Sequence, residues 1–472
     1  MAASRNRICT DPALGFPARL QALLGAGFPP GGRLWVGLSG GRDSVLQLAL
    51  LREAAPLLGF SLSAIHVHHG LSPRADAWAD FCVRLCRDWE LPLEVVRVQV
   101  APQGGEGLEA AARRARYAAY QALDGDALAL AHHQDDQAET LLLNLLRGAG
   151  VAGLAAMPPR RPLLRPGRTP LVLLRPLLDY PRAWIEDQLA RRGLDWVEDE
   201  SNGDARFSRN FLRRDVLPLL EQRFSARTSL ARAAAWAGEA ETLLEELAAE
   251  DGARGASPDF PGTLSLAALQ GLSGPRRRNL LRHWLHRQGG PRPEARTLAE
   301  LEAQVLAYRP DGQMAWRCGQ WVARGWRGAL FLEHDPLATP SLPESAPWEG
   351  EMPVPWGSGT IFSARATGQG LNAAALEAGP AQFRPRQGGE SFQLAGRPHR
   401  PLKKLLQESA VPPWQRERLP LLWLGETLAW VPGIGMGAAL ICPPEEEGWR
   451  LTWEPGTGQT AALGAQDGGR ND

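Results

Sequence analysis

The chain has 472 residues, of which 44% are hydrophobic and 22% charged, and its 52 basic and 52 acidic side chains cancel to a formal net charge of zero. This composition is ordinary for a globular protein of two to four domains. The zero net charge argues against a protein whose whole surface is basic and binds nucleic acid. With no apolar run of about 18 residues and no signal-peptide core, we expect a cytoplasmic protein without a membrane partner. The five scattered cysteines exclude a disulfide framework and a paired Cys-x-x-Cys metal site.

Short apolar strands alternate with helices from residue 33 to about residue 219. Strands are predicted at 34–38, 62–67, 93–98 and 127–131, and helices near 44–55, 75–89, 108–123 and 136–147. This alternation predicts an α/β domain over residues 1–215 that is built on a doubly wound parallel sheet. Ligands of such sheets bind beyond the carboxyl ends of the strands, and the richest motifs of this chain follow strands at that edge.

The rest of the chain divides by composition. Residues 216–334 carry long Ala, Leu, Glu and Arg runs at a 3.6-residue period, which predicts a helical domain. Six prolines between residues 335 and 357 predict a linker or a sheet edge. Residues 358–454 are expected to form a small α+β domain, and residues 455–472, rich in Gly, Ala and Gln, a disordered tail.

Residues 39–44, Ser-Gly-Gly-Arg-Asp-Ser, join the first predicted strand to its helix. The two glycines allow a tight turn with bare N–H groups, Ser39 and Ser44 add hydroxyl donors, and the positive end of the helix faces the turn. This layout predicts an anion-binding loop, with an ordinary Gly/Ser connection as the alternative. A Walker loop needs a lysine after its last glycine, whereas the only lysines of this chain are Lys403 and Lys404.

A second polar cluster, Ala-His-His-Gln-Asp-Asp-Gln-Ala-Glu-Thr at 131–140, follows the last predicted strand. Asp136 and Glu139 are three residues apart, so a helix places both carboxylates on one face, where they could hold a hard cation or orient a ribose and phosphate. A zinc site on the two histidines competes with this interpretation, but adjacent histidines rarely point the same way and no third soft ligand is near. A helix start that is capped by Asp135 is the purely structural alternative.

Together these motifs resemble the tRNA(Ile)-lysidine synthetases, members of the PP-loop ATP pyrophosphatase superfamily, in its long three-domain form. The resemblance rests on residues 39–44, Ile-His-Val-His-His-Gly-Leu at 65–71, Glu-Ala-Ala-Ala-Arg-Arg-Ala-Arg-Tyr at 109–117, and residues 131–140, in the family's order and spacing. Further matches lie at 147–157, 175–178, 198–210, 402–408 and 416–421. One departure is Gly-Gly-Glu at 388–390, where the family more often has Pro-Gly-Asp.

The resemblance implies an enzyme that uses ATP and Mg²⁺ to adenylate C2 of the wobble cytidine of tRNA(Ile) with a CAU anticodon. Free L-lysine then displaces AMP and forms lysidine, which switches codon reading to AUA. By resemblance, ATP would be bound by Ser39, Gly40, Gly41, Arg42, Asp43 and Ser44, with Asp43 also on the metal. The catalytic residues would be Asp136, Glu139 and Arg209, and the two carboxylates would also complement the lysine ammonium. The tRNA would be bound by Arg113, Arg116, Arg384, Arg386, Lys403, Lys404, Arg416 and Arg418.

Purely structural roles are the alternatives to some of these assignments. Arg113, Arg116 and Arg209 could instead form surface salt bridges, and we expect Trp414 in a core or at its edge rather than stacked on a base. The sequence does not fix the oligomeric state, and a homodimer is left as an open prediction.

The sequence argues against three other functions. A tRNA thiolating enzyme needs paired cysteines, but Cys82 and Cys86 have the wrong spacing and are expected to be buried small hydrophobes. A glutamine-dependent amidating enzyme would need a nucleophilic cysteine domain before the loop. A non-catalytic tRNA-binding protein has no need for both residues 39–44 and residues 131–140.

Overall fold

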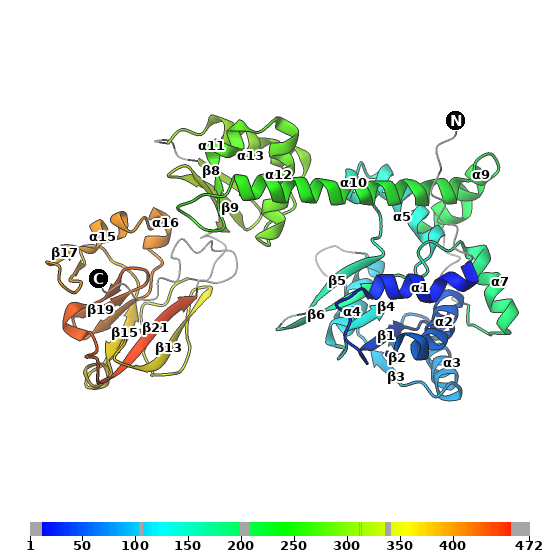
Figure 1. The fold of residues 1–472 in the computed structure, drawn as a ribbon, viewed down its shortest axis with the longest axis horizontal. Coiled ribbons are helices and arrows are strands. Elements are labelled where there is room, and N and C mark those ends of the chain that lie inside the picture. The colour runs from blue at the N-terminus through cyan, green and yellow to red at the C-terminus, as the bar shows by residue number, and fades with distance from the viewer. Residues whose placement is uncertain are drawn as a thin grey trace. The chain divides into compact units, whose positions relative to one another are not determined.

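The computed structural model describes residues 12–102, 107–165, 167–198, 208–310, 312, 314–335 and 341–454 (Figure 1). The chain contacts form two compact units, residues 1–243 and 244–472. The boundary falls inside the long helix α10 (Ala226–Arg254), so the domain limits expected after residues 215 and 334 stay predictions. Within the described ranges, no helix is both long and apolar enough to cross a membrane.

The first unit contains a six-stranded sheet in the order β3-β2-β1-β4-β6-β5. Its strands are β1 (Arg33–Gly37), β2 (Ser61–His68), β3 (Leu93–Arg97), β4 (Ala127–Ala129), β5 (Arg160–Arg165) and β6 (Arg168–Leu174). All neighbouring pairs are parallel except β5 with β6, which is antiparallel. The predicted doubly wound parallel sheet is therefore confirmed, with one additional antiparallel edge strand.

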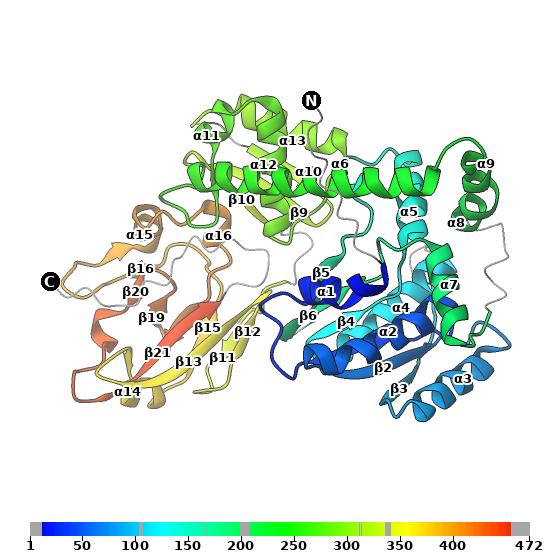
Figure 2. The ribbon, with the colours of Figure 1, turned by 45° about the vertical axis from the view of Figure 1, so that its right-hand side comes forward.

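Helices cover both faces of this sheet (Figure 2). The helices of this unit are α1 (Pro12–Leu24), α2 (Arg42–Leu58), α3 (Ala75–Asp88), α4 (Leu108–Ala122), α5 (Gln134–Leu146), α6 (Val151–Leu154), α7 (Arg182–Arg192), α8 (Ser208–Phe211), the π-helix η2 (Leu212–Val216) and α9 (Leu217–Glu221). Alternate residues of β1 serve two cores: Leu34 and Val36 pack with α1, α2, α3 and α7, whereas Trp35 packs with α4. The sheet is thereby buried on both faces, as parallel sheets require.

The two cysteines of α3 behave as the sequence predicts. Cys82 and Cys86 are both buried in the core on the face of the sheet that α2 covers. Burial raises the pKa of Cys82 to about 12 and that of Cys86 to about 11, so neither is a thiolate at neutral pH. Their role is that of small apolar side chains.

The second unit begins with helices around a four-stranded antiparallel sheet in the order β7-β10-β9-β8. The elements are β7 (Leu264–Ser265), α11 (Leu266–Gly271), α12 (Gly274–Arg287), α13 (Ala295–Ala307), β8 (Met314–Cys318), β9 (Trp321–Trp326) and β10 (Ala329–His334). The prediction of a helical segment is therefore wrong for residues 314–334. Arg327 and Gly328, both with positive φ, form a two-residue hairpin turn that sets Trp326 opposite Ala329.

The C-terminal part of the second unit holds two further sheets and short helices, in agreement with the predicted α+β domain. The five-stranded sheet is β11-β15-β18-β19-β20, the four-stranded sheet is β12-β13-β21-β14, and β16 pairs with β17. The bounds are β11 (Ala346–Pro347), β12 (Val354–Trp356), β13 (Gly359–Thr367), β14 (Leu371–Asn372), α14 (Ala373–Glu377), β15 (Ala381–Arg384), β16 (Ser391–Phe392), β17 (Arg400–Pro401), α15 (Leu402–Glu408), α16 (Pro413–Arg416), β18 (Leu421–Leu424), β19 (Thr427–Val431), β20 (Gly435–Met436), the 3₁₀ helix η3 (Ala438–Leu440) and β21 (Glu447–Glu454).

The proline-rich stretch 335–357 is not a linker throughout. Its strands β11 and β12 each form the outer edge of one of the two C-terminal sheets. Proline lacks an N–H donor and is therefore tolerated at such an edge, which was the other half of the prediction. The tail predicted to be disordered, residues 455–472, lies outside the described residues.

Candidate active site

The loop between β1 and α2 has the shape that an anion-binding turn needs. Gly40 has a φ of +84°, and a Cβ at this position would lie 2.9 Å from Cγ2 of Val197, so the turn requires glycine. Gly41 is the N-cap residue of α2 and makes no side-chain cap. The Ser39 and Ser44 hydroxyls lie 3.1 Å apart, and Ser44 Oγ donates to the Gly41 carbonyl at 2.8 Å, which fixes the loop. The first turn of α2 is thus left without a side-chain cap, as at anion-binding helix N-termini.

A histidine of the motif at residues 65–71, which begins in β2, contacts the residue before this loop. His66 is buried, and its Nδ1 lies 2.9 Å from the carbonyl oxygen of Leu38, the residue before the loop. Burial lowers the pKa of His66, so the ring is neutral at pH 7 and Nδ1–H can donate to that carbonyl. The residues 65–71 motif therefore helps to shape the loop.

Helix α5 begins with a reciprocal cap. His133 is the N-cap residue: its Nδ1 accepts from the Asp135 N–H at 3.2 Å, while Asp136 Oδ2 accepts from the His133 N–H at 3.0 Å. A cap by Asp135 is therefore wrong. The Asp135 carboxylate instead accepts from the Arg182 backbone N–H at 3.2 Å. This cap also gives one of the two adjacent histidines a structural role.

The two strand-to-helix junctions meet at His133. Because β1 and β4 are parallel neighbours, their carboxyl ends bring the loop and the start of α5 together. His133 Nε2 lies 3.8 Å from Asp43 Oδ2 and 3.6 Å from Asp136 Oδ2. Arg42 lies 3.5 Å from Asp43 and donates to Glu186 at 2.7 Å, so it is anchored beside the loop. The structure thus joins the predicted loop to the predicted carboxylates.

Two arginines hold the carboxylates of α5. Glu139, whose side chain is 1% exposed, accepts from Arg209 Nε at 2.9 Å and from Arg213 Nε at 2.6 Å. Asp136 Oδ1 lies 3.4 Å from Arg209 and 3.2 Å from Arg213. Burial alone would raise the pKa of Asp136, yet its interactions with His133, which donates its backbone N–H to the carboxylate, and the charge of Arg209 bring it well below its usual range. Asp136, Glu139 and Arg209 therefore lie together, as the sequence predicted.

Sequence reasoning missed Arg213. It follows Arg209 by four residues, and a spacing of four, like the spacing of three between the carboxylates, places side chains on one face of a helix, so this spacing was the available signal. The motif at 198–210 lies largely outside the described residues, which resume at Ser208.

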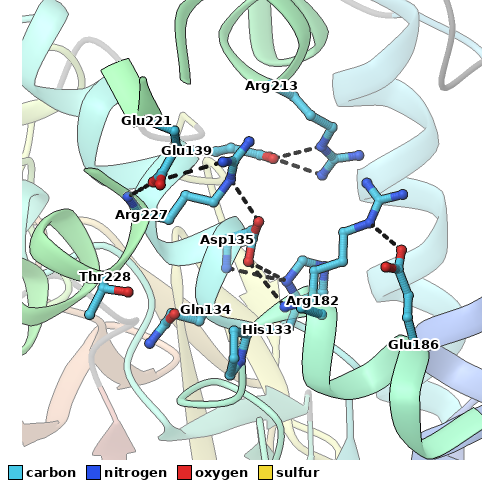
Figure 3. A pocket seen from close by; sticks show the side chains of 12 residues that line it. His133, Gln134, Asp135, Glu139, Arg182, Glu186, Arg213, Glu221, Arg227 and Thr228 are labelled. Atoms are coloured by element: carbon cyan, nitrogen blue, oxygen red, sulfur yellow. Dashed lines mark hydrogen bonds and ion pairs between the residues drawn. The ribbon is translucent and has the colours of Figure 1, made fainter. Parts of the chain in front are cut away.

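A cavity of about 540 Å³ opens beside these groups (Figure 3). Side chains of both charges line it: Arg227 pairs with Asp135 at 2.8 Å, and Arg182 pairs with Glu186 at 3.0 Å. The complete lining is His133, Gln134, Asp135, Glu139, Pro181, Arg182, Ala183, Glu186, Arg213, Glu221, Arg227 and Thr228. Its volume is in the range of small-molecule sites, and its lining suits a ligand that carries charges of both signs.

The carboxylates at this sheet edge could supply part of the coordination shell of a divalent cation. Among the described residues, no group of three or more His, Cys, Asp and Glu side chains could hold a metal by itself. Mg²⁺ that arrives with nucleotide phosphates needs only one or two protein carboxylates, because phosphate oxygens and waters complete its shell. Asp43 and Asp136, which approach the same nitrogen of His133, fit this requirement.

The predicted RNA-binding residues fall in both units. In the first, Arg113 and Arg116 are exposed on α4, where Arg113 donates to the Tyr117 hydroxyl at 3.3 Å and Arg116 to His69 at 3.2 Å. In the second, Lys403 and Lys404 are exposed on α15.

The remaining basic residues of the second unit have internal partners. Arg386 pairs with Glu390 at 3.2 Å, Arg416 donates to the Val411 carbonyl at 2.8 Å, and Arg384 lies 3.9 Å from Glu426. Arg418 is half-buried. RNA contact by any of these residues stays a prediction.

Two details of the second unit answer questions that the sequence raised. Glu390 accepts from the backbone N–H groups of Gln387 and Gly388 at 2.7 and 2.6 Å, so its carboxylate closes the Gly-Gly-Glu turn. Trp414 packs edge-on against Trp326 and Phe331 and donates to Glu333, which places it at a core edge as expected.

Comparison with known proteins covers most of the chain. A PP-loop domain model matches residues 15–220, a TilS substrate binding domain model residues 264–331, and a TilS substrate C-terminal domain model residues 381–453. The tRNA(Ile)-lysidine synthase of Azoarcus sp. (strain BH72) is 41% identical over 91% of this chain and 93% of that protein. The enzyme of the same name from Nitrosomonas europaea is 43% identical over 86% and 88%, and that from Chromobacterium violaceum is 45% identical over 85% and 91%.

The matches to these relatives are more than 40% identical and cover nearly the full length of each relative. The three family models match the chain in the same order as the three domains that the sequence predicts. The PP-loop domain model includes the junction of β1 and α2, where helix α2 starts at Gly41 without a side-chain cap. The thiolating, amidating and non-catalytic alternatives are thereby set aside. The chain belongs to the tRNA(Ile)-lysidine synthase family.

Proposed function

We propose that this protein uses ATP to join L-lysine to C2 of the wobble cytidine of tRNA(Ile) with a CAU anticodon. The observation that carries the proposal is the meeting of Asp43, from the loop, and Asp136, from α5, at His133. A nucleotide loop and a set of paired charges therefore share one sheet edge, which is what a two-step activation and transfer needs.

In the first step the C2 oxygen of cytidine attacks the α-phosphorus of ATP. The bond between that phosphorus and the bridging oxygen to the β-phosphate breaks, and pyrophosphate leaves. Residues Ser39–Ser44 would hold the phosphates through backbone N–H groups, and Arg209 would steady the negative charge that develops. Asp43, with Asp136 beside it, would hold Mg²⁺, whose chemistry here is the neutralisation of phosphate charge.

In the second step the side-chain amine of lysine, after losing a proton, attacks C2. The bond from C2 to the adenylated oxygen breaks, and AMP leaves with that oxygen. We place lysine in the cavity of Figure 3, which Glu139 lines. Glu139, together with Asp136 one turn before it on α5, would complement the side-chain ammonium of lysine before deprotonation. Arg182 and Arg227, which line the same cavity, would offer cations to its α-carboxylate.

The test is incorporation of labelled lysine into a CAU-anticodon tRNA(Ile) transcript with ATP and Mg²⁺, together with AMP release. Label should enter the RNA in a one-to-one ratio with AMP, and a transcript with a different wobble base should take up none. AMP release without label in the RNA would refute the lysine transfer. A homodimer and a cytoplasmic location also stay predictions, and the mass of the protein in solution tests the first.

A further inference from the structure

The Tyr117 side chain on α4 is surrounded by arginines from three elements. Arg113, one turn earlier on α4, donates to the Tyr117 hydroxyl at 3.3 Å, and its guanidinium carbon lies 4.9 Å from the ring centroid. The guanidinium carbon of Arg161, on β5, lies 5.4 Å from the same centroid. Arg175, which directly follows β6, also interacts with the hydroxyl. We call Arg113, Tyr117, Arg161 and Arg175 the Tyr117 cluster.

The Tyr117 cluster belongs to the functional edge of the sheet. β4 and β6 are parallel neighbours, so Arg175 after β6 and His132 after β4 emerge at the same edge. β5 runs antiparallel and pairs Arg161 with Leu173, near the carboxyl end of β6. Figure 2 shows α4 beside these strands. The cluster is therefore on the β6 side of β4, whereas the PP-loop lies on the β1 side.

The charges of the Tyr117 cluster are unbalanced. Among the residues that the structure describes, no carboxylate lies within 4 Å of the guanidinium nitrogens of Arg113, Arg161 or Arg175. Burial and the neighbouring arginines lower the pKa of Arg175 to about 10. Burial alone would raise the pKa of Tyr117, yet the arginines lower it. Like charges held together in a partly buried site are unfavourable unless an anion joins them.

Two nitrogens at this place lack a hydrogen-bond partner. Arg175 is 2% exposed and donates through Nη1 to the Pro158 carbonyl, but its Nε has no partner in the described structure. His132 Nδ1 is likewise buried without a partner. Buried polar atoms of this kind are rare in folded proteins and often mark the place of a ligand. An anion among these side chains would supply both an acceptor and the opposite charge.

We propose that the Tyr117 cluster binds a phosphodiester group of the RNA strand beside the nucleotide that is modified. The inference rests on the proposed function. Guanidinium forks match phosphate oxygens in a bidentate geometry, and Arg113 and Arg161 are accessible enough to meet a polymer. The phosphates of ATP have their own N–H donors at the start of α2. A nucleotide of the RNA that binds at this sheet edge, between the loop before α2 and the Tyr117 cluster, would place its backbone phosphate near the cluster.

The experiment measures the affinity of a CAU-anticodon tRNA(Ile) transcript over a series of salt concentrations, without ATP. Arg113→Gln and Arg161→Gln are the test variants, because Arg175 is buried and its replacement risks the fold. Arg114→Gln, one residue along α4 and outside the cluster, is the control with the same change of charge. Each test variant should weaken binding about tenfold and reduce the salt slope by about one, whereas the control should leave both unchanged. The affinity for ATP should not change in any of the three.

Two results would overturn the proposal. Equal affinities and salt slopes for the test variants and Arg114→Gln would show that the cluster does not bind RNA phosphate. A loss of affinity for ATP or inorganic pyrophosphate, with RNA binding intact, would assign the anion to the nucleotide. Lysine incorporation by the unmodified protein is scored separately. If that protein binds the transcript but incorporates no lysine, the proposed function fails while the phosphate site can still be judged from the slopes.

Discussion

Helices α2 and α5 start at the same sheet edge from neighbouring parallel strands, but their first turns are used in opposite ways. The N-cap of α2 is Gly41, which makes no side-chain cap, so backbone N–H groups remain for a ligand. The N-cap of α5 is His133, which forms a reciprocal cap with Asp136 and satisfies the N–H groups internally. The first junction thus presents its backbone, whereas the second presents side chains.

One strand-and-helix architecture thereby supplies two complementary subsites. A strand followed by a helix provides the dipole and the orphan donors, and the cap residue decides whether a ligand or the chain itself satisfies them. At α5, the cap frees the next turn of the helix to present Glu139 to Arg209 and Arg213. Phosphate binding and recognition of a charged amino acid can therefore be separated by mutation.

The largest effect on activity is expected from a change at Asp43, the loop residue whose carboxylate approaches His133 at the start of α5. Asp43→Asn removes the charge that would hold the metal at the proposed phosphate site, while the cap of α5 persists. Because a metal ion stabilises the transition state by several kcal/mol, AMP release in the presence of tRNA should fall by about a thousandfold or more. The circular dichroism spectrum should be unchanged. Near-normal AMP release by a folded variant would mean that the loop is wrongly assigned.

On the α5 side, Glu139→Gln should raise the lysine concentration needed for half-maximal rate by roughly a hundredfold. Weakening charge-assisted contacts typically costs about 2–3 kcal/mol. The affinity for ATP should change little, and adenylated RNA should accumulate when lysine is scarce. Glu53→Gln, on an exposed position of α2 that pairs with Arg192, is the matched control.

The opposite result would revise the comparison. If Glu139→Gln abolishes adenylation but keeps a normal lysine requirement, the main task of Glu139 is to hold Arg209 and Arg213 for ATP chemistry. The present contacts of Glu139 with both arginines make this the informative alternative. The lysine site would then have to lie elsewhere in the cavity.

A smaller effect, on stability, is expected to differ between the two glycines of the loop, Gly40 and Gly41. Gly40→Ala places a Cβ at a φ of +84° and 2.9 Å from Val197, which typically costs about 1–3 kcal/mol of folding free energy. Gly41→Ala meets no such penalty, because Gly41 has a φ of −73° and its nearest neighbour to a Cβ is 3.4 Å away. Urea denaturation should show a lower midpoint for the first variant only. Equal midpoints would show that the left-handed turn is not required.

Some parts of the fold and the site can be predicted from the sequence, and others cannot. The parallel sheet followed from strands and helices with clear periods, and Asp136 and Glu139 from their spacing of three. The strands of residues 314–334 were missed because the Arg327-Gly328 turn lacks the Asn-Gly or Asp-Gly signal, and charged or glycine residues interrupt their apolar pattern. The cavity could not be predicted, since its walls come from α5, α7, η2, α9 and α10, and pairing across such distances leaves no local pattern.

The smallest effect concerns the cap that distinguishes α5 from α2. His133→Ala removes the acceptor for the Asp135 N–H and should lower the free energy of unfolding by about 1 kcal/mol. His133→Asn keeps an acceptor of the kind that N-caps favour, and should recover most of that loss. Urea denaturation of both variants provides the measurement. If alanine and asparagine are equally destabilising, His133 acts through its contacts with Asp43 and Asp136 rather than through the cap, and the two junctions are coupled instead of separable.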